Sequence, residues 1–139
     1  MSEEPAAELD YAFPAHWARV NSDGTLTAID ASFLKVAAPK GTQVGFAVAA
    51  RVRFKGGLTH CDVKIDLKTP SGVTLSYVAG LDASAAPVYG NDRRHMLLAL
   101  NSSLLIEEYG DVQIDIYLDD QHARNLQFEI VEPAEPRSH

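Results

Sequence analysis

The segment from Gly110 to Glu132 constrains the fold of this chain more than any other stretch. Apolar and polar residues alternate on both sides of a polar turn at 119–122. The alternating apolar positions are Val112, Ile114, Ile116 and Leu118 before the turn, and Leu126, Phe128 and Ile130 after it. Because side chains of a strand alternate between its two faces, this pattern predicts an antiparallel hairpin with one buried face.

Further strands are expected upstream, separated by turns rich in Gly, Pro, Asn and Asp. They cover 11–20, 25–29, 33–36, 42–54, 61–67, 73–77 and 93–100, with 104–109 open between a short strand and a helical turn. Nowhere do apolar residues recur at 3.6 spacing over the ten or so positions that a helix needs. The sequence therefore predicts an all-β fold with little or no helix. We expect a single antiparallel β-sandwich, immunoglobulin-like or C2-like, of about seven to nine strands.

The chain of 139 residues suits one domain. The distribution of charge indicates where this domain begins and which partners are not expected. Residues 1–10 hold four acids and no base, which predicts a disordered acidic arm. A β-sandwich domain over 11–132 and a disordered tail over 133–139 are expected to follow. The net charge of −7 without a clustered basic face predicts neither a nucleic-acid partner nor a membrane partner.

A cytoplasmic location is expected from three absences in the sequence. Cys61 is the single cysteine, so no internal disulfide can form. The acidic start lacks the apolar stretch of a secretory signal, and no apolar run approaches the roughly 18 residues that span a bilayer.

The residue patterns of two expected strands indicate packing contacts outside the main core. One face of 42–54 carries Gly45, Ala47 and Ala49, whose small size indicates that something packs closely over them. The strand at 93–100 is apolar at both parities, which indicates burial on both sides or a surface that meets a partner. The candidate interaction surface comprises Ala47, Ala49, His95, Leu97, Asp115 and Tyr117.

Metal and catalytic sites have weaker support. His60 and His95 are candidate zinc ligands, and Asp82, Asp119 and Asp120 are candidate calcium ligands, although Asp-Asp is also ordinary turn chemistry. No serine lies in Gly-x-Ser-x-Gly, and no glycine-rich phosphate loop precedes a helix. We therefore expect no enzymatic activity and no cofactor.

Aromatic residues and charges each leave two interpretations open. Tyr11, Phe13, Trp17 and Tyr109 either line a ligand groove or belong to the core, and the core is favoured. Segment 35–68 carries seven bases against two acids, and 107–120 carries six acids and no base. These segments either neutralise each other within the chain, which is favoured, or form complementary surfaces for self-association.

Three pieces of the sequence resemble a family of uncharacterised small bacterial proteins, a domain of unknown function. They are 15–20 with the turn at Asp23-Gly24, the strand pair 52–54 and 63–67 ending in Ser71-Gly72, and the hairpin from Gly110 to Val131. The resemblance implies a β-sandwich and implies no activity.

These observations predict a non-enzymatic protein-binding or assembly module, acting through a protein partner or through self-association. The alternative is a β-sandwich that binds a small ligand or metal ion through loop 78–92 and the hairpin tip at 119–122.

Overall fold

The computed structural model describes residues 7–55, 58–84, 86 and 94–134 of the chain. These residues form ten strands and no helix, so the expected all-β class is confirmed and the expected seven to nine strands are too few. The strands are β1 (Ala7–Ala15), β2 (Trp17–Val20), β3 (Leu26–Ile29), β4 (Lys35–Ala37), β5 (Gln43–Phe54), β6 (His60–Lys68), β7 (Thr74–Asp82), β8 (Arg94–Leu105), β9 (Gly110–Leu118) and β10 (Gln121–Val131).

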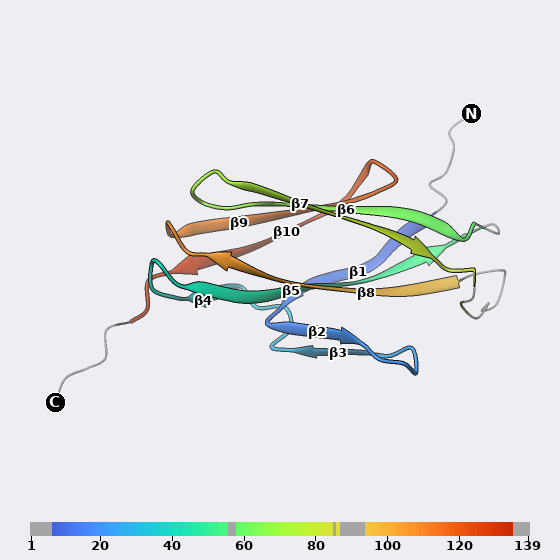
Figure 1. Cartoon of the computed structure of the whole chain (residues 1–139), viewed down its shortest axis with the longest axis horizontal. Helices are drawn as coiled ribbons and strands as arrows, with labels where there is room; N and C mark the ends of the chain where they lie inside the picture. The colour runs from blue at the N-terminus through green and yellow to red at the C-terminus, as the bar shows by residue number, and fades with distance from the viewer. Residues whose placement is uncertain (1–6, 56–57, 85, 87–93, 135–139) are drawn as a thin grey trace.

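The strands are arranged in three sheets (Figure 1). A three-stranded sheet has the order β1-β5-β8, a five-stranded sheet has the order β4-β10-β9-β6-β7, and β2 pairs with β3. All pairings are antiparallel except that of β4 with β10, so the five-stranded sheet is mixed and the expected wholly antiparallel arrangement is wrong. The ring of Phe33 packs edge-on against Phe128 at 5.0 Å, which holds the short strand β4 alongside β10.

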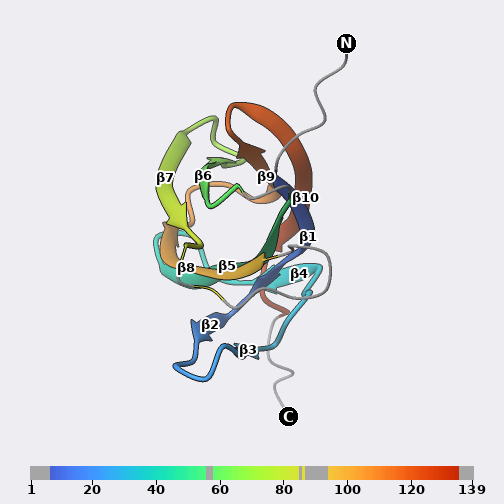
Figure 2. The same cartoon turned by 90° about the vertical axis from the view of Figure 1, so that its right-hand side faces the viewer.

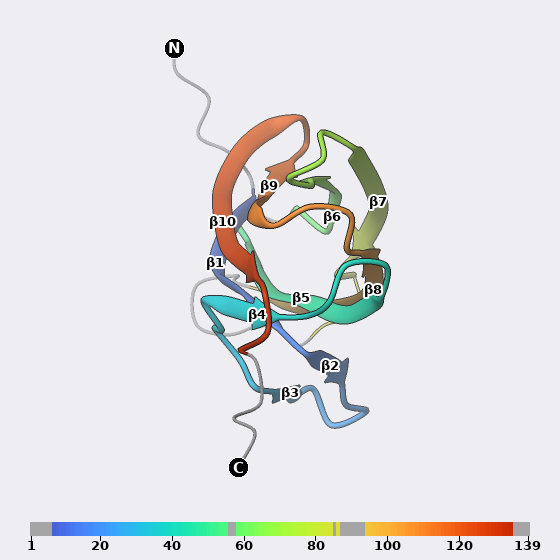
Figure 3. The same cartoon turned by 90° about the vertical axis from the view of Figure 1, so that its left-hand side faces the viewer.

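One apolar core lies between the two larger sheets, which curl around it in Figure 2 and Figure 3. Alternating residues of β5, β6, β9 and β10 supply most of it, as the two-residue period of a strand requires. The buried set from β9 and β10 is Val112, Ile114, Ile116, Leu118, Phe128 and Ile130, and Leu126 packs at its margin. The inward face expected for this hairpin is therefore confirmed.

The turn between β9 and β10 is built from two aspartates. Asp119 and Asp120 have φ values of 47° and 66°, the left-handed pair that a two-residue type I′ turn needs. The Asp119 amide donates to the Asp62 carbonyl at 2.8 Å, and the Asp62 amide donates to Asp119 Oδ1 at 2.9 Å. The hairpin tip is thus fastened to β6.

The β2–β3 hairpin forms a third layer on the outer face of the three-stranded sheet (Figure 1). Ala18 of β2 packs on Ala47 and Ala49 of β5, and all three are at most 1% exposed. Asn101 of β8 accepts from the Ala18 amide at 3.2 Å and donates to the Ala18 carbonyl at 2.7 Å. The close packing expected over Ala47 and Ala49 is confirmed, because only small side chains let two backbones approach this closely.

The N-terminal strands differ from the expected single strand at 11–20. The chain breaks at His16, so β1 ends at Ala15 and β2 leaves for another layer. Strand β1 begins at Ala7, and the expected disordered arm over 1–10 is wrong for 7–10, because ion pairs fix Glu8 and Asp10 to β5. Residues 1–6 lie outside the described part, as do 135–139 of the expected tail.

Two further boundaries differ. The expected loop at 78–92 is strand as far as Asp82, because β7 pairs with β6 from Lys68↔Thr74 to His60↔Asp82. Residues 85 and 87–92 of that loop lie outside the described part. Strand β8 continues through the expected break at 101–103 and ends at Leu105, because its ladder with β5 runs without interruption to Gln43. Within the described residues, no helix is long and apolar enough to cross a bilayer.

Candidate functional site

The β2–β3 hairpin covers only half of the sheet beneath it. Across the outer face of β1-β5-β8, the rows Phe13–Ala49–Ala99 and Ala15–Ala47–Asn101 lie under or beside the hairpin. The rows Tyr11–Arg51–Leu97 and Glu8–Arg53–His95 carry larger side chains. A groove of about 840 Å³ opens where the covered half ends.

This groove has an apolar wall and a partly charged floor. Its lining comprises Tyr11, Phe13, Val20, Asp23, Gly24, Thr25, Leu26, Arg51, Ala86, His95, Met96 and Leu97. The Tyr11 and Phe13 rings stack at 5.9 Å, and the Arg51 guanidinium lies 5.0 Å from the Tyr11 ring centroid. Of the aromatic residues considered for a ligand groove, Tyr11 and Phe13 therefore line one. Trp17 is 39% exposed on the hairpin, and Tyr109 packs at the margin of the core.

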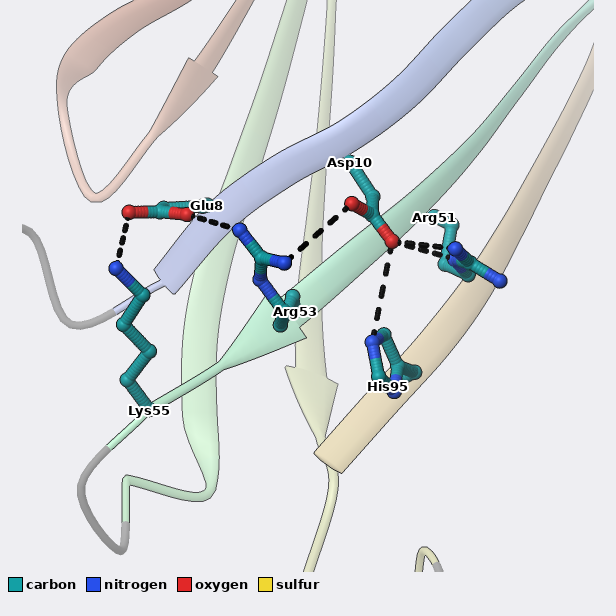
Figure 4. Close-up of polar contacts among 6 residues, drawn as sticks. All are labelled: Glu8, Asp10, Arg51, Arg53, Lys55 and His95. Carbon is teal, nitrogen blue, oxygen red and sulfur yellow. Dashed lines mark hydrogen bonds and ion pairs between the residues drawn. The ribbon is translucent and has the colours of Figure 1, made fainter. Parts of the chain in front are cut away.

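A network of charged side chains continues the floor toward the start of β1 (Figure 4). Asp10 accepts from Arg51 Nε at 2.7 Å and lies 2.6 Å from Arg51 Nη2. Its carboxylate also lies 3.8 Å from both Arg53 Nη1 and His95 Nε2. Glu8 accepts from Arg53 Nη2 at 2.5 Å and from Lys55 Nζ. Three strands are thereby joined across the outer face.

A bulge in β1 makes this network possible. The register with β5 shifts between Leu9 and Tyr11, so Asp10 is an extra residue opposite the ladder. A bulge of this kind lets adjacent residues face the same side. Asp10 and Tyr11 consequently both reach Arg51, one through its carboxylate and the other through its ring.

Replacing Glu8 with Gln should lower the free energy of unfolding by about 1 kcal/mol at neutral pH, because Arg53 and Lys55 lose a charged acceptor on a partly exposed surface. Hydrogen bonds from Lys55 and Arg53 hold the pKa of Glu8 below its ordinary value of 4.5. The contribution of this carboxylate is therefore complete above that value and is lost as the pH falls through the folded-state pKa. Urea titrations across this pH range measure it.

Glu108→Gln is the control for this measurement, because Glu108 is exposed and makes no ion pair within the described residues. A Glu8→Gln deficit that persists unchanged at about pH 2 would contradict the assigned role of the carboxylate.

Strand β8 borders the groove and is an edge of its sheet in the described part of the chain. Each residue from Arg94 to Leu100 is partly exposed. Met96, Leu98 and Leu100 pack against the core, and Met96 and Leu97 also line the groove. A long edge strand that is apolar on both faces is unusual, because such an edge is a ready template for pairing with another chain.

The six residues predicted for the interaction surface are divided between two sheets. His95 and Leu97 line the groove, whereas Ala47 and Ala49 are buried beneath the hairpin and face no partner. Asp115 and Tyr117 lie on the outer face of the five-stranded sheet. There His122 bonds Asp115 at 2.8 Å, and Lys64 lies over the Tyr117 ring at 5.3 Å. Hydrogen bonds from Asn125 and then His122 hold the pKa of Asp115 below 3.8.

The candidate metal ligands do not assemble into a site. His60 and Asp82 face each other on β6 and β7, and Asp119 lies near by, but Asp119 accepts from the Asp62 amide and Asp82 from the Ser84 amide. His95 belongs to the opposite sheet, beside Asp10. No group of His, Cys, Asp or Glu in the described residues has the geometry to hold a metal ion.

Cys61 points into the core, as its strand parity indicates, and is 0% exposed. Burial, with the nearby carboxylate of Asp119, raises the pKa of its thiol to about 12. A thiol in this setting is protonated at neutral pH and unsuited to nucleophilic chemistry.

The opposite charges of 35–68 and 107–120 are not paired with each other in the described residues. Cations of the basic segment pair with Glu8 and Asp10 of β1, with Glu129 of β10, and within β6. The favoured interpretation is right that the two segments neighbour each other, because β6 pairs with β9, but no ion pair within the described residues joins them. The acids of β1 were expected in a disordered arm. They lie opposite Arg51 and Arg53 because of the strand register and the bulge in β1, which no local sequence pattern indicates.

Comparison with known proteins gives a distant likeness. No family model matches the chain, and no curated protein matches it. A solved structure, Pseudomonas fluorescens alkylpurine DNA glycosylase AlkC bound to DNA containing an abasic site analog, is similar with a TM-score of 0.49 and 6% identity. The likeness covers 90% of this chain and 30% of that enzyme. The resemblance to small bacterial proteins stays a prediction.

Proposed function

We propose that this chain is a non-enzymatic protein-binding module with an immunoglobulin-like fold. Strands β1, β5 and β8 match the order A-B-E of one immunoglobulin sheet, and β6, β9 and β10 match C-F-G of the other. Strand β7 takes the place that variable-type domains give to strand C′. The inserted β2–β3 hairpin adds a layer to this plan.

The free edge of β8, with the groove beside it, is the contact surface in this proposal. The observation that carries it is the partial exposure of seven consecutive residues, 94–100, five of them apolar. Burial of such a row against a partner would stabilise the complex by roughly 25 cal/mol for each Å² of apolar surface removed from water. A cytoplasmic setting fits the proposal, because Cys61 is a free thiol.

Affinity capture from the source cells tests this function. We expect the tagged chain to retain a protein partner, and Leu97→Lys to lose it, because Leu97 lies where β8 meets the groove. Val78→Lys is the matched control, since Val78 is apolar and 73% exposed on β7, in the other sheet. Capture that is equal for both variants would contradict the proposal. Light scattering at tens of micromolar would identify a second copy of the chain as the partner.

The groove itself supports a second candidate function, the binding of a small ligand. Its volume of about 840 Å³ lies within the roughly 300–1,000 Å³ of ligand pockets. If the groove binds a small ligand, Leu26→Arg should abolish that binding, because Leu26 lines the groove. The wild-type chain should then capture no protein partner. Thermal shift screening of the wild-type chain against a metabolite library provides the measurement.

A further inference from the structure

We propose that the β2–β3 hairpin is a hinged cover, which opens and closes over the three-stranded sheet while the rest of the fold stays intact. Asn101 of β8 acts as its latch. The inference goes beyond the proposed function, because it concerns a motion within the chain and holds whether or not a partner binds β8.

The hairpin is a self-contained unit (Figure 1). Within the described residues, β2 and β3 pair with each other and with no other strand. Side chains near its turn also bond one another, since Asn21 donates to the hydroxyls of Thr25 and Thr27. The hairpin can therefore move away from the sheet without losing its own ladder.

The base of the hairpin is anchored to the rest of the fold. The Ser32 amide donates to the Pro14 carbonyl at 2.6 Å. The His16 ring stacks on Phe33, which packs against the main core. These contacts fix both connections of the hairpin and place a hinge where it leaves the sheet.

Beyond its base, the hairpin is fastened to the sheet by one side chain. Asn101 accepts from the Ala18 amide at 3.2 Å and donates to the Ala18 carbonyl at 2.7 Å. In the described part of the chain, these are the polar contacts that join β2 and β3 to the sheet beneath them. Asn101 is therefore a latch that acts on the backbone of β2.

The apolar layer beneath the hairpin is thin. Its buried residues are Ala18, Ala47 and Ala49, whereas larger side chains fill the main core. Apolar stabilisation scales with the area removed from water, and each alanine contributes one methyl group. Segments with few buried apolar contacts open at a lower free energy than the core does. The hairpin therefore opens more readily than the two larger sheets separate.

Opening of the hairpin changes the groove. Val20 and Leu26 of the hairpin line it together with Phe13 of the sheet. A hairpin that swings outward separates these walls and uncovers the row Phe13–Ala49–Ala99. The position of the hairpin thus sets the width of the groove.

Thiol labelling of the full chain with iodoacetamide tests the hinge. Ala49 lies beneath the hairpin, whereas its neighbour Ala50 is equally buried on the other face of β5. The new thiol of Ala49→Cys should be modified about a hundredfold faster than that of Ala50→Cys, because local opening costs less than global unfolding. Low urea should change the faster rate little and raise the rate at Cys61 steeply, since only global unfolding exposes a large surface. Peptide mass spectrometry measures each rate.

Removal of the side-chain amide tests the latch. In the Ala49→Cys background, Asn101→Ala should speed modification of the new thiol about tenfold, because Ala18 loses two hydrogen bonds that only the closed hairpin makes. Asn125→Ala is the matched control, since Asn125 is also an exposed strand asparagine with side-chain hydrogen bonds, but in the other sheet. It should leave the rate unchanged.

Hydrogen exchange of the Ala18 amide, followed by NMR in the wild-type chain, checks the opening without a substitution. This amide is bonded to Asn101 and should exchange faster than the ladder amides of β9. Equal labelling of Ala49→Cys and Ala50→Cys, or an Ala18 amide that exchanges only on global unfolding, would overturn the hinge. A labelling rate that Asn101→Ala leaves unchanged would overturn the latch.

Discussion

Replacing Ile116 with Ala should lower the free energy of unfolding by about 2–5 kcal/mol, because the substitution leaves a cavity in a packed core. Ile116 is 0% exposed and lies in β9, which is flanked by β6 and β10. Neither neighbour can move to fill the space without breaking ladder hydrogen bonds. Equilibrium unfolding in urea, with an unchanged slope, measures the loss.

Val78→Ala is the control for the core substitution, because it removes apolar atoms from a side chain that is 73% exposed. We expect a change within about 0.5 kcal/mol there. If the two substitutions had equal effects, β9 could not be the centre of the sheet. Such a result would undermine the whole arrangement of β10, β9 and β6.

Replacing Ala49 with Leu should destabilise the protein by about 1–3 kcal/mol, because the longer side chain has no room beneath the β2–β3 hairpin. Ala49 is 0% exposed and packs with Ala18 of β2. The hairpin must shift outward, and the groove at its margin changes with it. Trp17, the single tryptophan, begins β2, so its fluorescence reports the displacement.

Ala37→Leu is the matched control for the hairpin substitution, since Ala37 is an exposed strand residue of β4. Its effect on stability and on Trp17 emission should be small. An Ala49→Leu protein with wild-type stability and emission would show that the hairpin does not press on β5.

Local periodicity was sufficient to predict the central strands. The alternation at 110–131 identified β9 and β10 and their buried face, and the small residues Ala47 and Ala49 correctly indicated a covering layer. Each of these features depends on residues close together in the chain. The extension of β7 to Asp82 was missed because an edge strand buries only alternate residues weakly, and Gly80 interrupts the apolar pattern.

The candidate site was predictable in part. His95 and Leu97 were identified because their strand is apolar at both parities, and both line the groove. The place of Arg51 beside Asp10 was not predictable, since it depends on the pairing of distant strands and on one extra residue in β1. The parallel pairing of β4 could not be predicted either, because a three-residue pattern is too short to indicate whether the strand runs parallel or antiparallel to its neighbour.

The pairing of β4 with β10 also has a consequence for how the chain folds. Lys35 pairs with Glu129, so one of the earliest strands finds its partner near the end of the sequence. Domains dominated by such distant pairings fold in about milliseconds to seconds, because the chain loses the entropy of loop closure before the stabilising contacts form. During synthesis β4 must wait for β10 to leave the ribosome. The five-stranded sheet therefore closes only after β10 has been translated.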